Sequence, residues 1–563
     1  MNRWAGLALL LLAAALFSIA NRGAYRSYFQ DDEIENISWA PLTSHAEFLK
    51  YLVTPRFVGN NFRPVGHYYF HLAGGAFGLD FPKYIPWIHV LHLVTVVLLW
   101  MLLRKLGFAV PPSLAGCGFF AFHMALFDAY WKPMYVFDIL CALFCFASIL
   151  LYLNKRWVWS FVAFWVAYKS KELAVMLPAV LLAHELWLGE RRWKRLIPFF
   201  LVSLSFGIQG ILMNPNVNNE YTFRFTPKAL VTSVPFYASQ ILLVPFGGFL
   251  LLAVPFFVKD RRAWLGLAAM GLFFVPLLFL PGRLYAVYCY LPLTGAAVVL
   301  ATLAAQGSRW ISILFLAAWL PANMLLLREI RKTALAQAHE NRSYIQAIGE
   351  FTKSAPAIPM FVFDGAPDGF HRWGVEGTLR WFYRNQNIQA YPADDRDVAV
   401  AFKSPSLAVL SWDNRFQKLS TAVRAPGRPS ASYIEMNRTM PLWQLGRGWY
   451  RLEGYFRWAQ PWAAAELRWP ADARQFELKV NIGPAQIRTA GRVQVELALN
   501  GEDQGKREFT AAGVQAVRWD LKHPGPENAL VEFRIQPEFR LRSDPRNFGA
   551  AVVAFGFLPK ETQ

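Results

Sequence analysis

Cysteine is scarce in this chain, and several other features of soluble or repetitive proteins are absent. The four cysteines, Cys117, Cys141, Cys145 and Cys289, all lie in apolar segments, and none lies in the polar C-terminal part. The sequence therefore contains no disulfide framework and no cysteine spacing suited to a metal. Tandem repeats, low-complexity linkers and a glycine-rich phosphate loop are also missing, which excludes repeat proteins and nucleotide sites built on such a loop.

Apolar sequence, by contrast, is abundant. Of the 563 residues, 55% are hydrophobic and 16% are aromatic, and the mean hydropathy is +0.25. This composition is typical of a membrane protein. A formal net charge of +19 would suggest a nucleic-acid partner for a soluble protein, but here much of the Lys and Arg excess lies in short loops between apolar segments. We therefore expect a membrane lipid or a phosphate-bearing lipid as the partner, and no nucleic acid.

Eleven apolar segments are predicted to cross the membrane, because a span needs about 20 apolar residues. They are residues 4–21, 84–103, 110–126, 135–153, 157–169, 173–188, 196–213, 236–257, 264–280, 287–305 and 309–327. The first segment also has the pattern of a cleaved signal sequence, with Ser18-Ile19-Ala20 as a cleavage site. Because ten more apolar segments follow, the sequence favours a retained first span.

Every second connection between these segments is basic. The basic positions are Arg3, Arg104-Lys105, Lys155-Arg156, residues 191–195, residues 259–262 and Arg309. Such loops mark the cytoplasmic side, which predicts a bacterial inner-membrane protein with a cytoplasmic N-terminus and a periplasmic part from about residue 328. The alternation requires 157–169 and 173–188 to be two spans and not one long helix. It leaves no cytoplasmic domain for a nucleotide sugar.

Two of the predicted outer loops are long. Loop 22–83 contains the acidic run Asp31-Asp32-Glu33, then Arg63-Pro64, then an amphipathic stretch at 65–79 that is too polar and short to span. We expect this stretch to be a helix lying in the membrane interface. Loop 214–235 is polar and is expected to be rich in turns.

The polar C-terminal part is predicted to contain two modules after the transmembrane domain of residues 1–327. A charged helix at 328–350 and short apolar runs at 358–363, 388–391 and 407–412 indicate a small α/β module over 328–440. Alternating short strands from Gly448 onward indicate a β-sandwich or jelly roll over 441–563. Such modules often bind sugars through exposed tryptophans. Trp449, Trp458 and Trp462 are candidates, although packing in the core is the favoured interpretation.

Charged side chains are predicted at the outer boundary of the membrane in four loops. Transfer of a sugar to a hydroxyl needs a carboxylate that takes the hydroxyl proton, and cations that neutralise the departing phosphate. The candidate carboxylates are Asp31, Asp32, Glu33 and Asp128, and the candidate cations are Arg63, Lys132, Lys169, Lys171 and Arg283; Glu172 and Tyr288 lie beside them in the sequence. No cofactor is required by this pattern. A divalent metal ion on Asp32, Asp128 and His123 stays open, although His67, His71 and His123 are more typical of packed or interfacial histidines.

These residues occur in blocks that resemble the GT-C superfamily of glycosyltransferases that use polyprenyl-phosphate sugars. The similarity is to the protein O-mannosyltransferase type, including the transmembrane animal enzymes that carry TPR repeats. It rests on Asp31-Asp32-Glu33, on residues 120–129 (FAFHMALFDA) with Asp138 beyond them, on Ser170-Lys171-Glu172 with Leu177-Pro178, and on residues 281–292. The chain departs from the family in having Met124 after the histidine, Asp instead of Glu at 128, and a β-rich C-terminal part without TPR repeats.

The resemblance implies a lipid-linked donor that enters from the membrane and an acceptor, a protein or a glycan, that comes from the periplasmic side. It also implies inversion at the anomeric carbon. Asp32 or its neighbour Asp31 would be the base, Asp128 would orient the base or help hold a cation, and the basic residues would hold the lipid phosphate. Two other hypotheses remain: a transporter or flippase of a lipid-linked glycan, and a non-catalytic glycan-binding scaffold.

Overall fold

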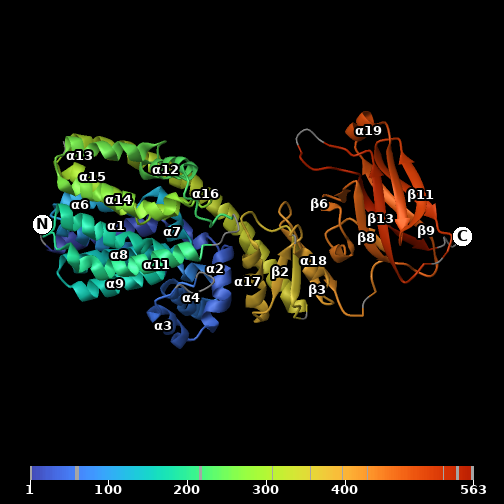
Figure 1. Cartoon of the computed structure of the whole chain (residues 1–563), viewed down its shortest axis with the longest axis horizontal. Helices are drawn as coiled ribbons and strands as arrows, with labels where there is room; N and C mark the ends of the chain where they lie inside the picture. Colours follow the sequence, from blue (N-terminus) through green and yellow to red (C-terminus); the bar gives the residue numbers. More distant parts are fainter. Residues whose placement is uncertain are drawn as a thin grey trace. The chain divides into compact units, whose positions relative to one another are not determined.

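The first part of the chain consists of helices, and the rest contains both helices and β-sheets (Figure 1). The computed structural model describes residues 3–56, 62–214, 219–306, 309–355, 357–395, 397–427, 429–523, 525–540 and 544–559. The side chains of residues 3–10, 31 and 309–313 lie outside this description. The chain divides into two compact units, a helical unit, Met1–His339, and a C-terminal unit, Glu340–Gln563.

The helical unit follows the apolar segments of the sequence. Its α-helices are α1 (Arg3–Ala20), α2 (Asp31–Trp39), α3 (His45–Val53), α4 (Pro64–Phe77), α5 (Ile85–Lys105), α6 (Val110–Ala121), α7 (Phe127–Trp131), α8 (Val136–Leu153), α9 (Trp157–Ser170), α10 (Leu177–Trp187), α11 (Ile197–Leu212), α12 (Pro227–Leu242), α13 (Val254–Phe257), α14 (Arg261–Leu278), α15 (Leu293–Gln306) and the first part of α16 (Arg309–Ser354). Short 3₁₀ turns link them, among them η2 (Ala40–Leu42), η5 (Met124–Leu126), η6 (Pro133–Tyr135), η7 (Glu172–Met176), η9 (Gly247–Ala253) and η10 (Ala286–Cys289).

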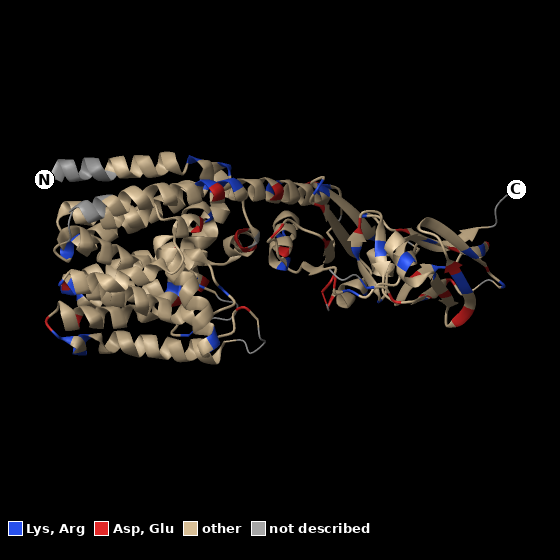
Figure 2. Cartoon of the chain, turned by 90° about the horizontal axis from the view of Figure 1, so that it is seen from above, with Lys and Arg blue, Asp and Glu red and all other residues tan. Residues whose placement is uncertain are grey.

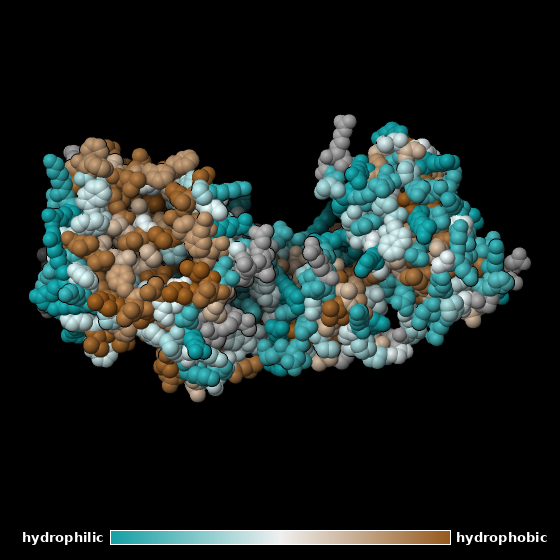
Figure 3. All heavy atoms as spheres, viewed as in Figure 1, coloured by the Kyte–Doolittle hydropathy of each residue, from teal (hydrophilic) through white to brown (hydrophobic). Residues whose placement is uncertain are grey.

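Long apolar helices make this an integral membrane protein. Within the described residues, four segments are long and apolar enough to cross a bilayer: Phe81–Lys105, Pro133–Leu153, Trp193–Leu212 and Arg261–Leu278. Two bent helix pairs raise the number to six if each pair is one span. The surface of the helical unit is broadly hydrophobic (Figure 3), and its charged residues gather at the two ends of the helices (Figure 2). The predicted total of eleven spans stays a prediction.

Two predicted spans are not continuous helices. The segment predicted at 236–257 contains a bend of 78° between α12 and the η9–α13 stretch, and the segment at 110–126 contains a bend of 50° after α6. At the first bend, Leu243 and Phe246 adopt left-handed conformations, with φ of 63° and 57°. Pro245 lies between them and lacks the backbone N–H that a continuing helix needs. The segment predicted as a span at 236–257 is therefore a bent pair of helices.

Two further boundaries differ from expectation, and a third agrees with it. Loop 214–235 is not turn-rich throughout, because α12 already begins at Pro227, where the Thr226 hydroxyl accepts a hydrogen bond from the Ala229 N–H. The predicted span at 309–327 and the charged helix at 328–350 form one helix, α16, which contains Pro321. The segments at 157–169 and 173–188 are two helices, α9 and α10, separated by η7, as the alternation of basic loops requires.

The basic loops that were assigned to the cytoplasm lie together at one end of the helical unit. The Lys105 ammonium donates to Asn154 Oδ1 at 2.8 Å, and Lys155 pairs with Glu190 at 2.9 Å. Arg262 reaches the Leu106 carbonyl and Arg261 reaches the Trp187 carbonyl, both at 3.4 Å. Loops that are far apart in sequence thus share one face, as the alternation of charge requires. The side chains of Arg3 and Arg309 lie outside the description.

The C-terminal unit begins within α16 and contains a four-stranded sheet followed by two larger sheets. The first sheet has the order β2-β1-β3-β4, with β1 (Met360–Asp364), β2 (Gln389–Pro392) and β3 (Leu407–Asp413) parallel and β4 (Lys418–Arg424) antiparallel. The helices of this module are α17 (Arg372–Tyr383) and α18 (Val398–Phe402). Its three parallel strands correspond to the apolar runs identified in the sequence.

The two larger sheets are antiparallel and share one hydrophobic core. One has the order β11 (Glu502–Phe509), β10 (Val493–Leu499), β13 (Asn528–Gln536), β8 (Trp462–Arg468). The other has the order β12 (Gly513–Asp520), β9 (Ala473–Ile482), β14 (Ala551–Pro559), β7 (Phe456–Ala459), β6 (Trp449–Glu453), with β5 (Tyr433–Glu435) paired to β14; α19 (Pro484–Ala490) joins β9 to β10. Side chains alternate between core and solvent, as along β10, where Val493, Val495 and Leu497 are buried.

Candidate functional site

The charged residues predicted for the outer boundary lie at the opposite ends of the helices from the basic loops. Helix α8 shows the separation: Asp138 lies in its first turn and Asn154, which contacts Lys105, follows its last residue. Sixteen residues of helix correspond to about 24 Å at 1.5 Å per residue. We call one connected set at this end, Glu220, Arg283, Tyr288, Lys171 and Asp138, the charge network.

Lys171 and Asp138 form the buried half of this network. Helix α9 ends at Ser170, and the extended backbone of Lys171 directs its side chain to α8, where the ammonium lies 2.7 Å from both Asp138 oxygens. The two side chains are only 12% and 3% exposed. The same ammonium lies 4.4 Å from the centroid of the Tyr288 ring. Such a cation is fixed in place without a ligand, which is the property that transition-state stabilisation requires.

We expect Lys171→Met to lower the stability of the folded protein strongly, because it leaves the buried Asp138 carboxylate without its cation. Breaking a buried pair typically costs about 3–5 kcal/mol. The matched control is Lys83→Met, which removes the cation of the exposed Lys83–Asp80 pair and should cost at most about 1 kcal/mol. Thermal unfolding in detergent measures both. Equal melting temperatures for the two variants would contradict a structural role for the buried pair.

Arg283 forms the exposed half of the network. Its Nε and Nη2 donate to the Tyr288 hydroxyl at 3.1 and 3.0 Å, and its Nη1 lies 2.9 Å from Glu220 Oε1. The guanidinium also lies 4.0 Å from the centroid of the Tyr221 ring. Gly282 permits this arrangement, since a Cβ on it would come within 2.7 Å of the Glu220 Cα atom. The guanidinium therefore already holds one anionic oxygen beside a hydroxyl.

A second ion pair lies beside the network. Arg63, immediately before α4, donates from Nε and Nη2 to the two oxygens of Glu172 at 2.8 and 3.0 Å. Burial raises the pKa of Glu172, but the Arg63 guanidinium more than offsets this and leaves that pKa below its usual value. The pair therefore stays charged at neutral pH. It joins α4 of the long outer loop to η7 and positions the start of both elements.

Asp32 lies near the exposed half of the network. Burial raises the pKa values of Tyr221 and Tyr285, and the Asp32 carboxylate adds to the increase in both. These two rings also contact Arg283, at 4.0 and 5.3 Å from its guanidinium carbon. The same pair of tyrosines thus contacts the Arg283 guanidinium and is affected by the charge of the Asp32 carboxylate. Asp31, the rival candidate, has a side chain outside the described residues.

Asp128 is held on a separate short element. It lies in α7 and pairs at 2.8 Å with Lys132, the residue after this helix; α7 packs against η10, the turn that carries Tyr288. Asn323 of α16 stabilises the bend before α7, because its side chain accepts from the Met124 N–H and donates to the Phe122 carbonyl, both at 2.8 Å. Asp128 and Lys132 neutralise one another and are both partly exposed.

Two predicted substrate-binding residues stabilise the fold instead of joining this cluster. Glu33 is fully buried, and its carboxylate accepts from the Gln30 N–H at 2.8 Å and from the Met134 N–H at 3.2 Å, which anchors α2 to η6. Lys169 donates to the Thr54 carbonyl at 2.6 Å, just after the end of α3. The Lys169 ammonium thus satisfies a backbone carbonyl at the C-terminus of α3.

The candidate histidine ligands are engaged in packing. His123 accepts from the Ala125 N–H through Nδ1 and contacts the Ile241 carbonyl through Nε2 at 3.0 Å, so neither ring nitrogen is left for a metal. His67 accepts from the Arg63 N–H, and His71 contacts the Ala40 carbonyl. Among the described residues, no group of three or more His, Cys, Asp or Glu side chains is arranged to hold a metal ion.

Glu220 and Tyr221 were not identified from the sequence, and Asp138 was noted only as part of a family pattern. Glu220 and Tyr221 lie in a polar loop with no motif, so their proximity to Arg283 depends on the tertiary fold. Asp138 carried a signal that was available, namely an acidic residue at the start of a strongly apolar helix.

Comparison with known proteins gives a limited result. No family model matches the chain, and no curated protein matches it. Among solved structures, ArnT from Cupriavidus metallidurans in the apo state has 13% sequence identity and a TM-score of 0.43, and covers 74% of this chain and 94% of its own. ArnT from the same organism bound to undecaprenyl phosphate has 12% identity with the same TM-score and coverage. Because this similarity does not establish a common fold, we infer the function from the residues of this chain.

Proposed function

We propose that this protein is a membrane glycosyltransferase, which moves a sugar from a polyprenyl-phosphate donor to an acceptor hydroxyl at the outer face of the membrane. One observation carries the proposal: Arg283, fixed by Tyr288 and already holding a carboxylate, contacts the two tyrosines whose pKa values the Asp32 carboxylate helps to raise, at the end of the helices opposite the basic loops. A cation fixed for an anionic leaving group and a carboxylate near it are the two groups that this reaction needs.

The reaction follows from these positions. The acceptor oxygen attacks the anomeric carbon as Asp32 takes the hydroxyl proton, and a new carbon–oxygen bond forms. The bond between the anomeric carbon and the phosphate oxygen breaks, and its electron pair remains on the phosphate. Polyprenyl phosphate leaves with more negative charge than it had in the donor, and Arg283 neutralises that charge. Attack opposite the departing phosphate inverts the configuration at the anomeric carbon.

The buried Lys171–Asp138 pair supports this site in a different way. The Lys171 ammonium lies against one face of Tyr288, whose hydroxyl accepts from two nitrogens of Arg283. Tyr288 is therefore held from two sides, and it holds the guanidinium in turn. Lys171 is thus a positioning residue for Arg283, and it adds positive charge near the phosphate.

Transfer from a defined panel of donors tests the proposal. Membranes that contain the wild-type chain are incubated with polyprenyl-phosphate mannose, glucose and galactose, together with periplasmic extract as the acceptor source. The resemblance to O-mannosyltransferases makes the mannosyl lipid the first donor to examine. We expect one donor to release polyprenyl phosphate in proportion to the sugar transferred. Movement of an intact lipid-linked sugar across the bilayer, with no release of phosphate, would instead indicate a flippase.

Glu220→Gln is expected to strengthen donor binding. The Glu220 carboxylate occupies one guanidinium nitrogen of Arg283 at 2.9 Å and therefore competes with a phosphate for the same cation. An exposed pair contributes up to about 1 kcal/mol, which corresponds to an affinity gain of at most about fivefold. The dissociation constant for polyprenyl phosphate measures the effect. The control is Glu190→Gln, which removes a comparable exposed carboxylate at the opposite end of the helices. This variant should have the same dissociation constant for polyprenyl phosphate as the wild type. Weaker binding in Glu220→Gln would contradict competition.

The orientation of the chain can be tested separately. The basic loops meet at one end of the helical unit, so we expect that end to face the cytoplasm and the C-terminus to face the periplasm. Alkaline phosphatase fused after Gln563 should be enzymatically active. Green fluorescent protein fused at the same position should not fluoresce, because it would be exported to the periplasm together with the C-terminus. A fluorescent, phosphatase-inactive fusion would place the proposed site in the cytoplasm.

A further inference from the structure

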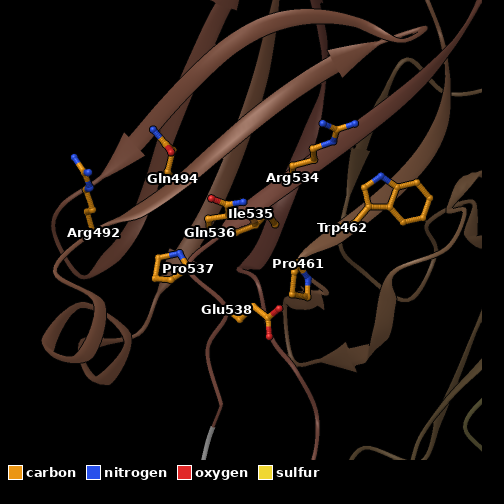
Figure 4. A pocket seen from close by; sticks show the side chains of 9 residues that line it. All are labelled: Pro461, Trp462, Arg492, Gln494, Arg534, Ile535, Gln536, Pro537 and Glu538. Atoms are coloured by element: carbon orange, nitrogen blue, oxygen red, sulfur yellow. The ribbon is translucent and has the colours of Figure 1, made fainter.

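The outer face of the sheet β11-β10-β13-β8 carries an unexplained hollow of about 620 Å³, within the size range of small-molecule sites. Its lining includes Trp462, Arg492, Gln494, Arg534, Gln536 and Glu538 (Figure 4). Trp462 lies at one end of the hollow and Arg492 at the other, with Arg534 and Gln536 between them. Aromatic, guanidinium and amide groups thus share one solvent-facing surface.

Trp462 differs from the other tryptophans that the sequence singled out. Trp449 stacks on Phe555 and donates from Nε1 to the Ala464 carbonyl at 2.7 Å, and Trp458 packs on Phe548 at 4.7 Å between ring centroids. Both therefore have a packing role. Trp462 is 41% exposed at the first position of β8. A ligand with a flat apolar face could stack on this ring.

Arg534 lies directly across from Trp462 in the pairing of β13 with β8. Its side chain is 66% exposed, and its nearest carboxylate, Glu496, is 4.0 Å away. The acidic side chains around the hollow have closer partners: Glu496 pairs with Lys506 at 3.5 Å, Glu508 with Arg492 at 3.2 Å, and Glu538 with Arg540 at 3.7 Å. Exposed pairs at such distances contribute little, so Arg534 can bind another carboxylate at small cost.

We propose that this hollow binds a glycan that contains uronic acid residues. One face of a pyranose ring is lined with C–H groups and can stack on Trp462, while the carboxylate of the same residue reaches the Arg534 fork, which binds two oxygens at once. Gln494 and Gln536, opposite one another in the pairing of β10 with β13, supply donors and acceptors for the hydroxyls of the next residue. The site is separate from the sugar-transfer residues and does not depend on their activity.

Binding of defined oligosaccharides to the full-length protein in nanodiscs tests this proposal. The probes are tetragalacturonate, tetramannuronate and a hyaluronan tetrasaccharide, with cellotetraose and chitotetraose as neutral counterparts, and calorimetric titration gives the dissociation constants. We expect at least one acidic probe to bind at least tenfold more tightly than both neutral ones, with affinity falling as salt is raised. Equal binding of neutral and acidic probes, or binding of none, would overturn the proposal.

Five variants locate the binding on the protein. Trp462→Ala should lower the affinity for the acidic probe by about tenfold or more, as is usual for an aromatic anchor. Trp462→Phe should retain part of that affinity. Arg534→Ala should reduce binding of the acidic probe and reduce its salt dependence. Arg474→Ala removes an exposed arginine from β9 in the other sheet and should have no effect. Asp32→Asn should bind as the wild type does, which separates this site from the transfer reaction. Unchanged binding in a folded Trp462→Ala variant would contradict the assignment.

Discussion

Asp32→Asn is expected to lower the rate of sugar transfer by about 10²–10⁴-fold, the usual loss when a positioned base is removed. Asparagine has nearly the same shape as aspartate but cannot accept the acceptor proton as the new bond forms. Asp32 is the candidate because its carboxylate acts on Tyr221 and Tyr285, the rings that contact Arg283. Initial rates of transfer with a saturating donor measure the effect.

Two further variants make that measurement specific. Asp80→Asn removes an exposed carboxylate of the same long outer loop, one that pairs only with nearby Lys83 in the described ion pairs, and it should transfer normally. Asp31→Asn tests the rival base. Full transfer by a well-folded Asp32→Asn variant would refute the assignment, and loss of transfer in Asp31→Asn alone would move the role to its neighbour.

Arg283→Ala should abolish measurable transfer, and Arg283→Lys should retain only part of it. The guanidinium can present two N–H groups to two phosphate oxygens, whereas an ammonium offers a single point of charge. Without Arg283, the negative charge that develops on the departing phosphate has no guanidinium that is held by the Tyr288 hydroxyl. The measurement is release of polyprenyl phosphate by each variant at equal protein concentration.

Helix α14 offers a matched control for Arg283. Arg262 lies near its first residue and Arg283 follows its last, and their side chains are equally buried, with 17% and 18% exposed. Each pairs with one carboxylate, Asp260 or Glu220. Arg262→Ala should therefore affect stability to a similar degree but leave transfer intact. Unchanged release of phosphate in Arg283→Ala would reduce Arg283 to an interfacial anchor and shift the role to Lys171.

The sequence predicted the helices better than it predicted their ends. Apolar runs identify where helices lie, because burial in lipid selects for hydrophobicity along the whole segment. Hydrophobicity alone does not identify the break at Leu243–Phe246, where Pro245 was an available signal that the prediction did not use. The apolar runs also missed the continuity of α16, where a membrane-type segment passes into a charged one without interruption.

Local sequence was a weaker guide to the roles of charged residues. The run Asp31-Asp32-Glu33 suggested a base at Asp32 or Asp31 and a substrate-binding role for Glu33, but a helix begins there, and Glu33 is used to cap it. Lys169 and Lys171 differ by two positions, yet one satisfies a carbonyl after α3 and the other enters the charge network. Glu220 reaches Arg283 only through the close approach of two loops at Gly282. Such partners depend on tertiary contacts between segments that are distant in the sequence.

Binding of polyprenyl phosphate and transfer of sugar, measured on the same purified wild-type, Asp32→Asn and Arg283→Ala proteins, tests the central claim most directly. The claim assigns the proton to Asp32 and the phosphate to Arg283. It predicts that Asp32→Asn binds polyprenyl phosphate as the wild type does and fails to transfer sugar, whereas Arg283→Ala loses both. Wild-type affinity for polyprenyl phosphate in Arg283→Ala, or the loss of that affinity in Asp32→Asn, would contradict it.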